Sequence, residues 1–496
     1  MGSYVRRPWW RWSNSALAWP VAELAVAGGL RLSHDQRWRR GGLFAYLPVP
    51  HILNMISTMF KGVFVGARPL SPQVQSDNDS SQRSTYIKLL ILWTMWSLLY
   101  AWHGAYVSTS LLWGIAIFVV IGALVIHKPT MRGSWSAMLA VYVVMIASSW
   151  LMFFVPGPHW PFALAFPVPL AALVIGFSSK SRLRAVGWCA IVVLEGICIV
   201  SAWHWGKVHI DVFSITQQGA LDFLRGANPY QSWFQSTTVG VARFRYDYGP
   251  LWLLVTTPFA RLGDVRVLIG LSSVGILALG AWRYGWRRYA TWMWLALLLL
   301  SPWLVWGTLM SWTELTMMAL LLAWYATRQR WRFAWLFLAV ALGANPVIGV
   351  LLLPMFAIMP EVRRQVLYAG LVAGACWLCA WGFSGADFIQ AFKIAGGQGY
   401  TPTIGFGGLY LLLTHHALPK IVTVAVALVV SYWLWRYRAS SIWRRELLAG
   451  VGCLLIVWAM PAGYFEYALI PALWLWWTLG QATVLVAAPE AKASSA

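Results

Sequence analysis

The chain has 496 residues, of which 60% are hydrophobic and only 10% are charged. Soluble domains carry about 25% charged residues, so this composition excludes an ordinary soluble protein and indicates an integral membrane protein. The net charge of +22 would point to nucleic acid in a soluble protein, but here the basic residues lie in short clusters between apolar segments. That distribution is typical of cytoplasmic loops, and we expect no nucleic-acid partner.

Residues 1–85 differ in character from the rest of the chain. They contain Arg- and Trp-rich pieces such as RRPWWRW (6–12), which suit a cytoplasmic membrane surface because cations meet anionic headgroups there and Trp favours the interface. The stretch SPQVQSDNDSSQRS (71–84) is typical of a disordered linker. We therefore expect a cytoplasmic, membrane-surface region up to residue 85.

A helix of about 20 apolar residues crosses a bilayer. Residues 86–180 contain four such segments, predicted as additional transmembrane helices, and residues 181–486 contain the larger series, followed by a short tail at 487–496. The predicted fold is an all-α polytopic membrane protein with about 13 to 14 transmembrane segments. The segments are 87–102, 107–126, 135–155, 160–178, 185–204, 265–282, 289–306, 309–327, 333–360, 365–384, 418–435, 446–462 and 467–486.

Two stretches depart from a simple span. The run 333–360 is interrupted by Asn345-Pro346, and proline removes a backbone donor and disfavours helix at the preceding residue. Two short helices, 333–343 and 347–360, are therefore predicted. The stretch PLWLLVTTPFARL (250–262) is too short to span and is predicted to lie along the external interface.

Basic clusters assign the two sides of the membrane. When the segments are counted, the clusters between them fall on one side, which the positive-inside rule makes the cytoplasm, together with the N-terminus. Charges in or near a bilayer are costly and usually face a cavity, so polar residues gathered on the other face predict a site, although each alone can cap a helix or lie in a wet loop. The external face receives Asp211, Asp222, Asp247, Glu314, Asn345 and Glu466.

The stretch HIDVFSITQQGALDFLRGANPY (209–230) follows directly on the fifth span. Asp211 is thus held at the external mouth, where a partly desolvated carboxylate is a suitable general base for a hydroxyl. Residues 212–224 are predicted as an amphipathic interfacial helix, and 226–230 as a helix stop and turn.

Charged residues elsewhere on the external face suggest substrate contacts. Arg243 and Arg245 lie in the external loop that follows Asp211 and suit bidentate phosphate contact, and an ordinary solvated loop explains them as well. Glu314 begins a helix, where it can meet a sugar hydroxyl or simply be favoured by the helix dipole. The first external loop has no D-x-D pair, so no metal site is predicted, and use of a divalent metal stays open.

These features together resemble the GT-C superfamily of polytopic glycosyltransferases, nearest the family-87 type that uses polyprenol-phosphate mannose. The resemblance covers roughly residues 185–485, and it rests on the order and the spacing of the motifs. The matching features are Asp211, the G-x-N-P-Y turn (226–230), YDYGPL (246–251), PFARLGDVR (258–266), WTE (312–314) and the split helix at LGANP (342–346).

The resemblance implies a GT-C-like bundle with interfacial helices in the first external loop, and an inverting sugar transfer. Asp211 would deprotonate the acceptor hydroxyl, which displaces a polyprenyl phosphate from the sugar. The sugar would be mannose or another hexose or pentose, and the acceptor a lipid, a glycan or a protein. Arg243, Arg245 or Lys393 would compensate charge on the leaving phosphate. The expected substrate contacts are His209, Asn228, Tyr230, Arg243, Arg245, Tyr246, Asp247, Tyr248, Glu314, Asn345 and Glu466.

The chain departs from the family pattern in three places. The usual Y-P-P-L reads Tyr248-Gly249-Pro250-Leu251, a Lys commonly found before the proline of the split helix is Asn345, and Glu466 stands where His is frequent. His204 and His209 lie near Asp211 and can substitute for the missing groups.

Two further classes of protein fit part of the pattern. A transporter or lipid flippase also uses broken helices and charges at membrane depth, but it would carry out no covalent chemistry. A membrane scaffold would use Asp211 only to cap the interfacial helix. The long segment 205–249 favours the enzyme, because long loops without secondary structure of their own are usually functional or disordered. Polyprenyl-phosphate sugar, acceptor and membrane lipids are the expected partners.

Overall fold

The structure, a computed structural model, describes residues 211–234, 245–285, 313–395, 418–436, 442–460, 467 and 469–487, with a few residues near 186–190, 291–298 and 410–414. The predicted N-terminal region and the four additional helices of 86–180 lie outside these ranges, as does most of the span 185–204. The described residues belong to one unit, Thr58–Ala496.

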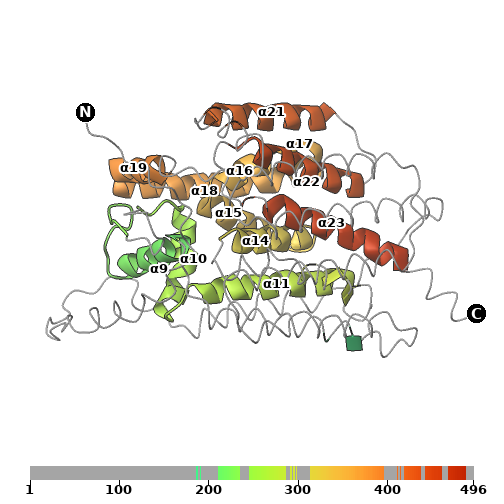
Figure 1. Ribbon diagram of the computed structural model, residues 1–496, viewed down its shortest axis with the longest axis horizontal. Helices are drawn as coiled ribbons and strands as arrows, with labels where there is room; N and C mark the ends of the chain where they lie inside the picture. Colours follow the sequence, from blue (N-terminus) through green and yellow to red (C-terminus); the bar gives the residue numbers. More distant parts are fainter. Residues whose placement is uncertain are drawn as a thin grey trace, which may run out of the picture. The chain divides into compact units, whose positions relative to one another are not determined.

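Helices are the only regular elements in the described ranges, which confirms an all-α fold there (Figure 1). Two of them, Arg266–Tyr284 and Pro360–Ser384, are long and apolar enough to cross a membrane. The helices are α9 Asp211–Leu224, α10 Pro250–Arg261, α11 Arg266–Tyr284, α14 Thr313–Thr327, α15 Trp335–Ala344, α16 Val347–Leu351, α17 Leu353–Ile358, the 3-10 turn η2 Pro360–Val362, α18 Arg363–Ser384, α19 Ala386–Ala395, α21 Lys420–Arg436, α22 Ile442–Trp458 and α23 Leu469–Ala487.

The helix break at Asn345-Pro346 is where the sequence predicts it. Helix α15 ends at Ala344, and Asn345 is extended (φ −144°, ψ 118°), as expected of a residue before proline. The predicted helix over 347–360 is present as the apolar helical segment Val347–Ile358, and a one-residue turn at Leu352 divides it into α16 and α17. Pro354 explains this second division, since a proline in the first turn of α17 cannot donate a backbone hydrogen bond back into α16.

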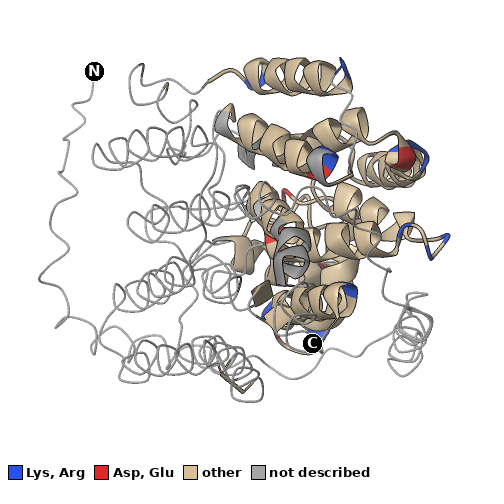
Figure 2. Cartoon of the chain, turned by 90° about the vertical axis from the view of Figure 1, so that its right-hand side faces the viewer, with Lys and Arg blue, Asp and Glu red and all other residues tan. Residues whose placement is uncertain are grey.

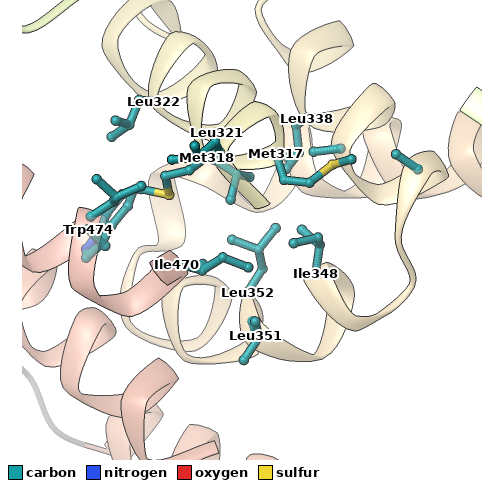
Figure 3. Close-up of a cluster of buried hydrophobic side chains, with 14 of the residues drawn as sticks. Met317, Met318, Leu321, Leu322, Leu338, Ile348, Leu351, Leu352, Ile470 and Trp474 are labelled. Carbon is teal, nitrogen blue, oxygen red and sulfur yellow. The ribbon is translucent and has the colours of Figure 1, made fainter. Parts of the chain in front are cut away.

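Helix α14 lies at the centre of the described helices. It packs against α11, α15 and α23, and α15 in turn packs against α18. Most of its side chains are buried, which fits a helix that is apolar on every side. Figure 3 shows part of this core, where α14 meets α15, α16 and α23. The labelled side chains are Met317, Met318, Leu321, Leu322, Leu338, Ile348, Leu351, Leu352, Ile470 and Trp474.

Helices α18 and α21 turn their large apolar side chains outward. Helix α18 buries only Ala369, Ala373 and Ser384, while Leu371 and Phe383 are 63% and 75% exposed. Helix α21 similarly exposes Ile421, Leu428, Val429, Trp433 and Trp435. Soluble monomers rarely expose contiguous apolar surface of this kind, whereas helices in lipid pack through small residues and direct large ones outward.

The helices have two chemically different ends. One, the arginine end, comprises Arg283, the loop Arg328–Arg332, Arg363, Arg364 and Arg445. Contacts hold it together: the Gln365 side chain donates to the Arg328 carbonyl (2.9 Å), and Arg445 pairs with Glu361 (3.0 Å). Figure 2 looks onto this end, where Lys and Arg lie at the ends of several helices. The opposite ends of the same helices form what we call the motif end.

Candidate functional site at the motif end

Helix α9 begins at Asp211, and the side chain of Asp211 lies outside what the structure describes. The helix buries Val212, Ile215, Thr216 and Ala220, a repeat that follows the helical period. The predicted amphipathic helix over 212–224 is therefore confirmed, although its last residue, Leu224, is exposed.

The turn after α9 is built by two residues of the G-x-N-P-Y motif. Gly226 has φ +77°, the left-handed conformation that commonly ends a helix and that only glycine adopts without strain. The side-chain oxygen Oδ1 of Asn228 accepts from the backbone N–H of Tyr230 at 3.1 Å, which closes the turn over Pro229. The same oxygen accepts from the Ser384 hydroxyl at 3.2 Å, so the turn is tied to the end of α18.

Tyr230 links this turn to the YDYGPL block. Its hydroxyl donates to the Tyr248 carbonyl (3.2 Å), and its ring meets the ring of Tyr246 edge to face at 5.4 Å. Burial raises the pKa values of both Tyr230 and Tyr246, so each hydroxyl stays protonated at neutral pH. The Tyr246 hydroxyl is buried and finds no hydrogen-bond partner among the described residues. Asp247, between the two rings in sequence, is half-buried.

Gly249 joins the YDYGPL block to the split helix. Its N–H donates to the Ala344 carbonyl at 2.8 Å. A Cβ at position 249 would lie 2.1 Å from the Gly343 carbonyl oxygen and 2.7 Å from the Trp377 ring, so no larger residue fits. A Cβ at Gly343 would in turn lie 2.4 Å from the Leu251 side chain. Glycine at position 249 is thus required by the close approach of two backbones.

Asn345, which stands where the family carries Lys, works as a helix cap. Its Oδ1 accepts from the backbone N–H of Val347 (3.0 Å), and its Nδ2 donates to the Tyr467 hydroxyl (3.3 Å). These bonds connect the split helix to the segment that follows α22, which contains Glu466. Glu466 itself lies outside the described residues.

Glu314 is a buried carboxyl in the first turn of α14, with 1% of its surface exposed. Its Oε1 accepts from the Thr313 hydroxyl at 3.1 Å. Its Oε2 has no hydrogen-bond partner among the described residues. A buried polar atom without a partner is costly, and such atoms in native structures often mark a ligand site.

Arg245 is paired within the protein. Its Nη1 lies 2.9 Å from Oδ1 of Asp387 in α19, and its guanidinium lies over the Trp233 ring at 4.7 Å. Gln231 also donates to the Asp387 carboxylate (3.1 Å). We call this group, Gln231, Trp233, Arg245 and Asp387, the loop clasp, because it fastens both described ends of the loop 231–249 to α19.

The carboxyl group of the loop clasp should make the stability of this loop depend on pH. Hydrogen bonds from Arg245 and then from Gln231 lower the pKa of Asp387 from its ordinary value of 3.8. A carboxyl with a lowered pKa stabilises the fold above its unfolded-state pKa and loses that contribution as the pH falls through the folded-state value. Acidification below about pH 4 should therefore lower the protection of residues 228–234 and 245–249 from hydrogen exchange. In the variant Asp387→Asn, these two segments should already be less protected at pH 7.

Hydrogen exchange with mass spectrometry, corrected for intrinsic rates, would measure this loosening. The matched control is Asp264→Asn, which removes the ion pair to Arg266 (2.6 Å) outside the loop clasp. Equal protection in wild type and Asp387→Asn would contradict the prediction.

Ser384, which bonds to the turn, and the clasp residue Asp387 were not predicted as site residues, and helix α19 was not predicted at all. The available signal was the sequence ADFIQAFKIA, which has an acid in its first turn and apolar residues at helical spacing. Other predicted residues lie outside the description. They are His204, His209, Arg243, Glu466 and the side chain of Lys393.

Comparison with models of known protein families, with curated proteins and with solved structures gave no match. In the part of the chain that the structure describes, the protein is all-helical, and two helices there are long and apolar enough to span a membrane.

Proposed function

We propose that this protein is a polytopic membrane glycosyltransferase that moves a sugar from a polyprenyl-phosphate donor to a hydroxyl acceptor. Its active site would lie at the motif end, on the external side of a cell membrane. The multi-pass topology and the orientation are part of this proposal. They are supported by the outward-facing apolar residues of α18 and α21 and by the concentration of arginine at the other end.

One observation supports the proposal: three motifs of the sequence meet one another at one end of the helices, and the third of them contacts Tyr467. The G-x-N-P-Y turn bonds to the YDYGPL block through Tyr230. That block bonds to the split helix through Gly249, and the split helix bonds to Tyr467 through Asn345. The turn, the YDYGPL block and the split helix are among the features that resemble the GT-C family, and a catalytic site needs such convergence because its groups must reach one bound substrate.

In the proposed reaction, the carboxylate of Asp211 takes the proton of the acceptor hydroxyl. The acceptor oxygen then bonds to the anomeric carbon as the bond from that carbon to the phosphate oxygen breaks. The electron pair leaves with the polyprenyl phosphate, and the configuration at the anomeric carbon inverts. Asp211, at the start of α9, would thus act on the acceptor. Oε2 of Glu314, in the first turn of α14, would bind a hydroxyl of the donor sugar.

The leaving phosphate requires a cation, because negative charge accumulates on it in the transition state. Arg245 is already engaged by Asp387 and Trp233, so we assign it to holding the loop in position. Arg243 and Lys393 are then the cations proposed to contact the phosphate. His209 is the proposed substitute for the Lys and His that the family carries where this chain has Asn345 and Glu466.

Sealed vesicles test the proposal against transport. Purified protein is inserted into vesicles of cell-envelope lipids, which supply acceptor hydroxyls, and a polyprenyl-phosphate donor with a radiolabelled sugar is supplied from one side. We expect label to appear in a new covalent product on the side of the motif end. Label that accumulates across the bilayer on an unchanged donor would contradict the enzyme and support a flippase.

A further inference from the structure

The arginine end carries an exposed surface with a regular order of side chains. On α18, Arg364, Tyr368 and Leu371 follow one another on a single exposed face, at helical spacings of four and three residues. Tyr368 and Leu371 are 52% and 63% exposed. This face thus runs from a cation through an aromatic ring to an aliphatic side chain.

The neighbouring helix repeats the order. Arg332 is exposed and precedes α15, and Leu336, four residues later, is exposed as well. Trp335 of α15 meets Tyr368 of α18, with ring centroids 6.2 Å apart. Because α15 and α18 pack directly against each other, the two series lie side by side.

The two arginines are available for a ligand. The ion pairs among the described residues include neither Arg332 nor Arg364, although Arg332 lies over the Phe333 ring at 4.5 Å. The acids at this end are engaged elsewhere: Glu361 pairs with Arg445, and buried Glu446 accepts from the Tyr325 hydroxyl at 2.5 Å. No described acid therefore competes for these two guanidinium groups.

We infer that Arg332, Arg364, Tyr368, Leu336 and Leu371 form a binding site for an anionic phospholipid, which we call the α15–α18 lipid site. The guanidinium groups would bind the phosphodiester, since Arg suits bidentate contact with phosphate. Tyr368 and Trp335 would lie at the level of the headgroup, where aromatic rings are favoured. Leu336 and Leu371 would contact the acyl chains. The site rests on the proposed membrane location and not on glycosyl transfer.

Native mass spectrometry of the full-length protein would test the site, with phosphatidylglycerol and phosphatidylcholine as probes. We expect phosphatidylglycerol to be retained by the wild type, and to bind the double variant Arg332→Gln/Arg364→Gln about 30-fold more weakly. The variant Arg332→Lys/Arg364→Lys keeps the charges and should retain most of the binding. Arg332 and Arg364 are exposed, and circular dichroism would check that both double variants remain folded.

The matched control is Arg225→Gln/Arg261→Gln, which removes two exposed arginines at the end of α9 and in α10. It should bind phosphatidylglycerol as the wild type does. Equal loss in this control, unchanged binding in Arg332→Gln/Arg364→Gln, or equal retention of phosphatidylcholine would overturn the site. Complete displacement by millimolar inorganic phosphate would do so too, because it would show a site for a free anion. Loss of glycosyl transfer without loss of lipid binding would bear on the proposed function alone.

Discussion

Asp211→Asn should reduce sugar transfer by about 10²- to 10⁴-fold, because an amide cannot accept the proton of the acceptor hydroxyl. The substitution keeps the size of the side chain, and Asn is as good a residue as Asp at the start of a helix. Binding of the donor and the melting temperature should therefore change little. Initial rates of transfer, with donor binding measured separately, would show the loss in the rate and not in affinity.

Asp222→Asn is the matched control for this prediction. Asp222 lies on the same helix, is partly exposed and pairs with Arg225 at 3.6 Å, its one ion-pair partner among the described residues. It should transfer sugar at close to the wild-type rate. Equal rates in Asp211→Asn and wild type would remove Asp211 from the mechanism, and equal losses in both variants would indicate a general effect on α9.

Gly249→Ala should be the most destabilising of the conservative substitutions considered. The backbone of Gly249 is extended (φ −71°, ψ 164°), so alanine meets no conformational strain there. The cost is steric, since the new Cβ would lie 2.1 Å from the Gly343 carbonyl oxygen. Forcing the α10 and α15 backbones apart should cost about 3 kcal/mol or more and should displace the loop that carries Tyr246 and Tyr248. Thermal unfolding and sugar transfer should therefore both be impaired.

Gly275→Ala in α11 provides the comparison, because a Cβ at that position meets nothing within 4 Å. Alanine there should leave the melting temperature unchanged or slightly higher, because alanine has a higher helix propensity than glycine. If Gly249→Ala and Gly275→Ala had the same melting temperature, this result would contradict the close approach of the two backbones.

The local features of the motif end could be predicted from sequence. The period of apolar residues predicts α9, Gly226 predicts its end, and Pro346 predicts the break after α15. Each of these depends on a residue and its immediate neighbours. The division of α16 from α17 depends equally on a local residue, Pro354, and was missed because a proline in an apolar run can also be tolerated within a membrane helix.

The contacts between motifs could not be predicted in the same way. Counting segments places Asn228, Tyr248, Asn345 and the end of α18 at one end of the helices, but it does not say which atoms meet. Arg245 illustrates this limit. The sequence indicates a cation near Asp211, and only the packing of α19 gives it Asp387, 142 residues away, as a partner.

The roles of the site residues follow from the resemblance and from the geometry together. Asn345 keeps the position of the family's Lys but caps α16, and Gly249 keeps the position of a proline but admits the Gly343 backbone. The structure thus gives each of these two residues a local role that does not depend on the resemblance.

The most direct test of the central claim is a single-turnover reaction of the purified wild-type protein with a panel of polyprenyl-phosphate sugars as donors and an extract of cell-envelope lipids as acceptors. The product is isolated, and the configuration at its anomeric carbon is compared with that of the donor by nuclear magnetic resonance. A glycosylated product of inverted configuration from at least one donor is the expected result. No product from any donor with folded protein, or a product of retained configuration, would contradict an inverting transfer at the motif end.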